Sequence, residues 1–308
     1  DRIDSRLARP GQTATDMSDR SSPPDGERRE REDLLVTALR RLGRLPLGML
    51  RGVGAALGLA AYLLAPGYRR KIRANLHRAG YPSRREAWRA AAEAGRMAGE
   101  LPFIWTRGPA AIARWIACDD LATLEAAEAG GHGVVFLTPH LGAFEVTARF
   151  LAQRAPITVL FKPPTKPWLR PLLEFSRNTG AMRAVPATLG GVRAMLRALR
   201  SGEAIGLLPD QVPGDGDGRW VPFFGEPAYT MTLPQRLAQH PGVRVVFTVG
   251  ERLPGGQGWR VHFEAMEEEP PPEAINARME ALIRRYPAQY LWSYNRYKRP
   301  RAAAQAPQ

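Results

Sequence analysis

Apolar residues form short, nearly continuous runs at four places along the chain, at 133–138, 157–161, 204–209 and 243–249. Such runs are typical of strands that are buried on both faces of a parallel sheet. Segments with the apolar spacing of helices lie between them. This alternation predicts an α/β fold with a largely parallel central sheet flanked by helices.

The helical spacing predicts amphipathic helices at 84–105, 143–153, 166–179, 189–200, 231–239 and, after a proline-rich hinge, 273–285. One further segment, 258–266, alternates apolar and polar residues. Alternation is typical of a strand with one exposed face, so we expect an edge strand there.

The most hydrophobic stretch is 45–66, which Arg51 interrupts. Its uninterrupted part is close to the lower length limit for a membrane span. Basic residues flank it on both sides: Arg40, Arg41, Arg44, Arg69, Arg70, Lys71 and Arg73. This pattern predicts a membrane-associating helix that lies in the interface or crosses it, and a buried core helix is the alternative.

Composition divides the chain into four parts. Residues 1–32 are rich in charge, proline and serine and predict a disordered tail. A membrane-associating helical segment at 33–68 and a catalytic α/β domain at 69–300 follow. A short disordered tail is expected at 301–308.

The chain of 308 residues is strongly basic, with 44 Lys and Arg against 30 Asp and Glu and a formal charge of +14. An excess of this kind indicates an acidic partner, such as anionic lipid, an acidic carrier protein or nucleic acid. Cys118 is the single cysteine. The sequence therefore excludes a disulfide within the chain and argues against a zinc site.

The run GVVFLTPHLGAFE brings together an imidazole and a carboxylate. His140 follows a predicted buried strand, and ligands of open α/β sheets lie at the carboxyl ends of strands. Glu145 comes five residues later, about 140° away on a continuous helix. The two side chains can meet only if Gly142 bends the backbone between them. We interpret His140 as a general base and Glu145 as the carboxylate that orients it.

Other chemistry is less well supported. The chain has no G-x-S-x-G motif. The acidic loop at Asp215 has Arg219 and Trp220 where a calcium loop requires a ligand and a glycine. The aromatic and basic segment WSYNRYKRP suits single-stranded nucleic acid or a membrane interface.

Several blocks in one order resemble the lipid A biosynthesis acyltransferases, the late lauroyl and myristoyl transferases. These blocks are ANLHRAGYPSRREAW, PHLGAFE, FKPPTKPWLRPLLEFSRNTGA, GEAIGLLPDQ, VPFFGEPAYTMTLPQRLA and YPAQYLWSYNRYKRP. The resemblance implies a glycerolipid acyltransferase-like fold. It also implies direct acyl transfer from an acyl carrier protein to a hydroxyl of a lipid, without a metal, a cofactor or a covalent acyl-enzyme.

The resemblance also implies roles for single residues. His140 and Glu145 match the His-x4-Asp/Glu signature of the wider superfamily. The residues expected to contact substrate are Gly142, Lys162, Arg177, Asp210, Gln211, Phe223 and Phe224. Ala143–Phe144 replaces an Asn-Trp found in many members, and Lys162 stands where many have arginine. Lysine lacks the forked guanidinium that binds phosphate in two places, so this departure bears on which lipid is the acceptor.

The leading prediction is an acyltransferase that acts on a lipid A precursor at the cytoplasmic face of a bacterial inner membrane, with no nucleic acid as partner. Two alternatives remain. The same chemistry could act on a lysophospholipid, an aminolipid or a glycolipid, or the chain could be a non-catalytic, basic membrane-binding protein.

Overall fold

The computed structural model describes residues 25–161 and 180–300. The helices are α1 (Asp25–Leu42), α2 (Leu47–Leu64), α3 (Pro66–Arg78), α4 (Arg84–Thr106), α5 (Pro109–Ala113), α6 (Leu121–Glu128), α7 (Phe144–Leu151), α9 (Leu189–Arg200), α10 (Leu233–Ala238) and α11 (Pro272–Arg285), with short 3-10 turns η2 (Pro254–Gly256) and η3 (Pro287–Gln289). The strands are β1 (Ile116–Cys118), β2 (Val134–Leu137), β3 (Ile157–Phe161), β4 (Met182–Pro186), β5 (Ala204–Leu207), β6 (Gly218–Phe223), β7 (Glu226–Met231), β8 (Arg244–Arg252) and β9 (Trp259–Ala265).

Seven strands form the central sheet in the order β1-β9-β8-β2-β5-β3-β4. All neighbours are parallel except β8 and β9, which are antiparallel. The predicted mixed α/β architecture with a mostly parallel sheet is therefore confirmed. The expected edge position of 258–266 is wrong, because β1 pairs with the outer side of β9. The alternation in β9 comes from polar residues such as His262, which finds carboxylate partners instead of solvent.

The two faces of the sheet carry separate halves of the core. Val135, Leu137 and Phe247 point to the half that includes residues of α9, α10 and α11. Phe136 and Val246 point to the other half, which includes residues of α7 and α4. Helices therefore cover both faces, which explains why the central strands are apolar without alternation.

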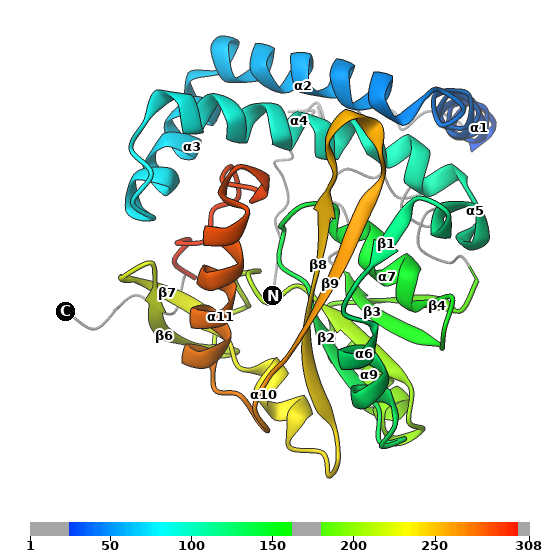
Figure 1. Cartoon of the computed structure of the whole chain (residues 1–308), viewed down its shortest axis with the longest axis vertical. Helices are drawn as coiled ribbons and strands as arrows, with labels where there is room; N and C mark the ends of the chain where they lie inside the picture. The colour runs from blue at the N-terminus through cyan, green and yellow to red at the C-terminus, as the bar shows by residue number, and fades with distance from the viewer. Residues whose placement is uncertain (1–24, 162–179, 301–308) are drawn as a thin grey trace, which may run out of the picture.

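Helices α2 and α4 run antiparallel to each other beyond the end of β8 and β9 (Figure 1). Gly54 and Gly58 of α2 face Gly95 and Gly99 of α4, and a Cβ at any of them would collide with the opposite backbone. Small residues at this four-residue spacing allow two helices to approach closely. Helix α2 is therefore packed along its length against the domain.

Several elements were not predicted. They are α3, α5, α6, β1, β4 and the two-stranded hairpin of β6 and β7. Helix α1 begins at Asp25, inside the segment expected to be disordered, while residues 1–24 and 301–308 lie outside the described residues. The helix expected at 166–179 also lies outside them.

Candidate active site

His140 lies in the loop that follows β2, at the carboxyl end of the central sheet. Asp210 follows β5, the strand that pairs with β2 in parallel. The two side chains meet there. Nδ1 of His140 lies 3.0 Å from Oδ1 of Asp210, and the backbone N–H of His140 donates to Oδ2 at 3.0 Å. One carboxylate thus fixes both the ring and the backbone of His140.

Asp210 is completely buried. Burial by itself would raise the pKa of its carboxyl group, but the ion pair and hydrogen bonds with His140 and the charge of Arg296 bring that pKa below its usual value. Asp210 is therefore ionised at neutral pH. An ionised carboxylate at Nδ1 holds the proton on that nitrogen and leaves Nε2 as the basic atom.

The C-terminal segment covers the imidazole from the other side. Tyr294 stacks on the His140 ring at 5.3 Å between centroids, and the backbone N–H of Leu291 donates to the His140 carbonyl. Phe144 contacts the ring edge at 5.1 Å. These contacts leave the His140 side chain 13% exposed and restrict the ring to one orientation.

Glu145 lies in the first turn of α7. Nε1 of Trp105, on α4, donates to its Oε2 at 3.4 Å. Its charge also acts on Arg149 one turn further along: burial lowers the pKa of that guanidinium, and Glu145 opposes the shift. Strand pairing, and not local spacing, brings Asp210 to Nδ1 of His140. The orienting role that the sequence analysis gave to Glu145 stays a prediction.

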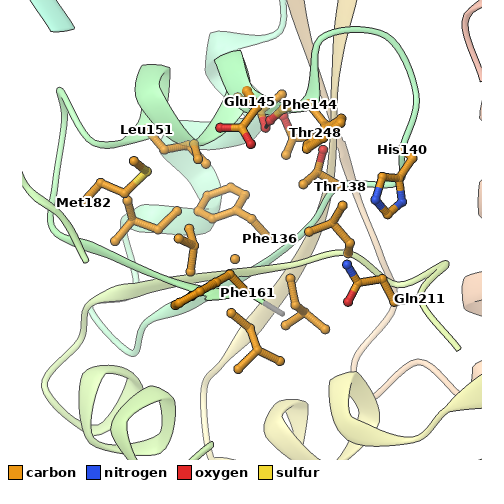
Figure 2. A pocket seen from close by; sticks show the side chains of 18 residues that line it. Phe136, Thr138, His140, Phe144, Glu145, Leu151, Phe161, Met182, Gln211 and Thr248 are labelled. Carbon is orange, nitrogen blue, oxygen red and sulfur yellow. Dashed lines mark hydrogen bonds between the residues drawn. The ribbon is translucent and has the colours of Figure 1, made fainter. Parts of the chain in front are cut away.

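A pocket with an empty volume of about 800 Å³ opens beside His140. His140, Glu145 and Gln211 lie around it together with Thr138 and Thr248 (Figure 2). Its remaining wall is mostly apolar and comes from α7, β2, β3, β4 and β5: Phe136, Phe144, Ala148, Leu151, Ile157, Val159, Leu160, Phe161, Met182, Gly206 and Leu207. An apolar cavity with a few polar groups at one place is the usual form of a small-molecule site.

Gly142 provides the bend between His140 and Glu145 that the sequence predicted. Its φ is +61°, in the left-handed region, and a Cβ there would collide with the carbonyl of Gly250. The backbone of Ala143 donates to that carbonyl at 2.7 Å, and Nη2 of Arg252 donates to the Gly142 carbonyl at 3.2 Å. The loop is therefore held against β8 by its backbone.

Arg252 belongs to a buried ion cluster below this loop. It contacts Glu100 at 2.9 Å and Glu93 at 2.7 Å. Glu100 also accepts from Arg51 at 2.9 Å and from Trp259 at 3.1 Å. Burial alone would lower the pKa of Arg252, but the two glutamates raise it above its usual value. The cluster joins α2, α4 and β8 to the loop between His140 and Glu145.

The other residues that were expected to contact substrate lie in different places. Gln211 lines the pocket, while Lys162 and Arg177 lie outside the described residues. Phe223 and Phe224 do not line this cavity. They pack in the opposite half of the core, where Phe223 contacts Arg296 and Tyr297 and Phe224 contacts Trp292. This is the core position that aromatic residues commonly occupy.

Sequence reasoning missed the partner role of Asp210 and the stacking of Tyr294. A usable signal existed for Asp210, because it follows a buried strand as His140 does, and parallel strand ends lie at one edge of a sheet. In the part of the chain that the structure describes, no three His, Cys, Asp or Glu side chains are arranged to hold a metal ion. The absence of a cofactor stays a prediction.

The profile of the bacterial lipid A biosynthesis acyltransferases matches residues 31–299. The chain belongs to this family. Among its relatives, the lipid A biosynthesis lauroyltransferase of Escherichia coli is 26% identical over 209 residues, which cover 65% of this chain and 67% of that protein. The lipid A biosynthesis myristoyltransferase of the same organism is 26% identical over 281 residues, which cover 83% of both chains. As a member of this family, the chain is an acyltransferase.

Proposed function

We propose that this acyltransferase moves a fatty acyl chain from an acyl carrier protein thioester to a hydroxyl of a lipid A precursor. The observation that carries the proposal is the pocket itself, in which an apolar cavity ends at an imidazole held by a buried carboxylate. The cavity suits an acyl chain, and the imidazole suits the activation of a hydroxyl. The choice of a lipid A precursor as acceptor comes from the relatives, whose names place them in lipid A biosynthesis.

The reaction follows from the two nitrogens of His140. Asp210 keeps the proton on Nδ1, so Nε2 accepts the proton of the acceptor hydroxyl as its oxygen attacks the thioester carbonyl. The C–S bond then breaks, and the leaving thiolate takes that proton from the imidazolium. Asp210 stabilises the imidazolium in between.

The basic surface suits the donor. Acyl carrier proteins are acidic, and a chain with a formal charge of +14 attracts an acidic partner over a long range. High salt should therefore slow the reaction with the carrier-protein donor more than the reaction with a neutral acyl thioester.

We further propose that α2 lies in the plane of the membrane at the cytoplasmic face of the inner membrane. Among the described residues, α2 is the one helix that is long and apolar enough to cross a membrane. However, its polar residues Arg51 and Tyr62 are buried against the domain. Its exposed positions are all apolar: Gly48, Met49, Gly52, Val53, Ala56, Leu57, Ala61, Leu63 and Leu64.

If α2 spanned the bilayer, α4 would have to enter it too, because the two helices pack in backbone contact at their glycines. Glu93, Arg96 and Glu100 of α4 would enter with it, and charges at that depth are costly. An in-plane helix avoids this cost. Exposed basic residues near its two ends, including Arg41 and Arg44 on one side and Arg70 and Lys71 on the other, suit anionic headgroups.

Mass spectrometry of lipids tests the proposed acceptor. Cells that lack the gene should lose one acyl chain from lipid A, and the wild-type gene should restore it. A gene carrying His140→Ala serves as the control and should not restore it although its protein accumulates normally. An unchanged lipid A profile together with the loss of another acylated lipid would assign a different acceptor.

A further inference from the structure

Two hydroxyl groups in the pocket are buried without a hydrogen-bond partner among the described residues. They belong to Thr138 and Thr248, whose side chains line the cavity beside His140. The two residues are 8% and 1% exposed. Most buried polar groups in proteins are paired, and an unpaired one costs about 1–3 kcal/mol. Two such groups in one pocket therefore indicate a ligand atom that pairs with them.

The sheet places these hydroxyls side by side. Leu137 of β2 is in register with Phe247 of β8, so Thr138 and Thr248 are the next pair along the two parallel strands. Neighbouring strands lie about 4.8 Å apart, and both side chains project on the face of Phe136 and Val246. Figure 2 shows the two threonines close together at the His140 side of the cavity.

A third threonine in the same wall shows what a structural role looks like. Thr147 of α7 is also buried and also lines the cavity. Its hydroxyl donates to the carbonyl of Phe144 at 2.7 Å, so its hydrogen-bonding capacity is used within the protein. Thr138 and Thr248 differ from it in that their hydroxyls are left for a ligand.

We propose that Thr138 and Thr248 donate hydrogen bonds to the carbonyl oxygen of the acyl donor and stabilise the negative charge that it acquires during the reaction. This rests on the proposed function. When the acceptor oxygen attacks the carbonyl carbon, the π electrons of the C=O bond move to the carbonyl oxygen. They re-form the C=O bond when the C–S bond breaks. Donors fixed in advance around such an oxygen are among the largest contributions to acyl-transfer catalysis.

The position of the pair agrees with this role. The acyl chain would occupy the apolar part of the cavity, and His140 activates the hydroxyl that attacks the chain's first carbon. The carbonyl must therefore lie between the apolar wall and His140, where the two hydroxyls are. The sheet holds both backbones, because Thr248 lies within β8 and the N–H of Thr138 donates to the carbonyl of Leu207.

The kinetic test uses Thr138→Val and Thr248→Val in the full chain, since valine keeps the shape and removes the hydroxyl. With lauroyl-acyl carrier protein and a lipid A precursor, each variant should lower kcat about 10²-fold, with KM changed less than about threefold. The matched control lies outside the pocket: Thr106→Val removes a hydroxyl that donates to the carbonyl of Pro102 at 2.8 Å, so this variant should keep kcat but lower Tm. The two pocket variants should keep or raise Tm. Unchanged kcat in both pocket variants overturns the proposal.

A second measurement separates this proposal from the proposed reaction. Lauroyl thioester labelled with ¹³C at the carbonyl is bound to the His140→Ala protein, and its carbonyl stretch is recorded by infrared spectroscopy. We expect a lower frequency than in solvent, and a return towards the solvent value when both threonines are also changed to valine. An identical stretch with and without the hydroxyls overturns the carbonyl site. A wild-type protein that shows the shift but transfers no acyl group contradicts the proposed reaction alone.

Discussion

Two buried polar regions lie on either side of the loop between His140 and Glu145, and they differ in how fully their polar atoms are paired. In the ion cluster below the loop, every side-chain nitrogen and oxygen of Arg51, Arg252 and Glu100 has a partner within the protein. In the pocket above it, Thr138 and Thr248 have none among the described residues. Complete pairing is what a structural region needs, whereas unpaired groups are available to substrate. Changes in the cluster should therefore affect stability, and changes in the pocket should affect activity.

The largest expected effect is on the cluster. Glu100→Gln removes the charge that two buried arginines share, and we expect the free energy of unfolding to fall by about 3–5 kcal/mol. Urea denaturation measures it. Glu203→Gln is the matched control, since Glu203 pairs with the largely exposed Arg183 and its loss should cost about 1 kcal/mol or less. Equal effects of both substitutions would contradict a structural role for the cluster.

Asp210→Asn should affect activity more than stability. An amide keeps the size of the side chain but no longer stabilises the imidazolium of His140, so we expect kcat to fall about 10²-fold or more. Steady-state kinetics across pH measures it. Restoration of most of the activity by Asp210→Glu would support a positioning role, whereas an unchanged kcat in the asparagine variant would return the orienting role to Glu145.

The lowered pKa of Asp210 also gives a dependence of stability on pH. A carboxyl group whose pKa is lower in the folded state contributes stability above its unfolded value, near 3.9, and loses it as pH falls through the folded value. The stability difference between wild type and Asp210→Asn should therefore shrink below about pH 4. Chemical denaturation at a series of pH values measures this, and a difference that grows on acidification would contradict it.

The depth of the pocket should set the preferred acyl chain. Gly206 lies in its wall, and a Cβ there would lie 3.2 Å from Val159 and 3.5 Å from Ile157. Gly206→Ala removes space without a severe clash, so the preference should shift to donors shorter by one or two carbons, by about tenfold. Because both donors are compared on the same protein, the ratio of their kcat/KM values does not depend on how much of that protein is active. An unchanged ratio would mean that the chain lies elsewhere.

The outward face of α2 should show a smaller effect that leaves both buried regions intact. Val53→Asp with Leu57→Asp should weaken binding of the full chain to anionic vesicles about tenfold, because charges replace apolar contacts with lipid. Leu189→Asp, at an equally exposed leucine of α9, is the control and should bind normally. Flotation measures the bound fraction.

Spin labels at positions 49, 53, 57 and 64 distinguish the orientation of α2 in the same vesicles. An in-plane helix gives one shallow depth at all four positions. A graded depth along the helix would show a span, and labels without contact with lipid would show that another protein surface covers the face.

Some parts of the fold and of the candidate site could be predicted from the sequence, and others could not. The strands at 133–138, 157–161, 204–209 and 243–249 and the helix at 84–105 were predicted within a few residues, because burial on both sheet faces and helical periodicity leave local patterns. The place of His140 after a buried strand and the bend at Gly142 were also readable from the local sequence. The pairing of His140 with Asp210 was readable only in part: both residues follow buried strands, but the fold decides that these two strands are neighbours in parallel register.

The ion cluster was hidden for a different reason. Arg51 looks in the sequence like an interruption of a membrane segment, and only its packing against α4 shows that it points inward to Glu100. The hairpin of β6 and β7 was missed because each strand carries a proline and a charged residue, which interrupt the apolar pattern.

The glycine seam and Arg51 together make α2 part of the fold. Many membrane-bound enzymes yield a soluble catalytic domain when the anchor is cut away. A chain shortened to begin at α3 would lose Arg51, one of the two arginines that pair with Glu100. It would also expose the small residues of α4 that α2 covers. If α2 lies on the membrane as proposed, a form of this enzyme that stays in solution would have to keep α2 and carry polar residues on its exposed face.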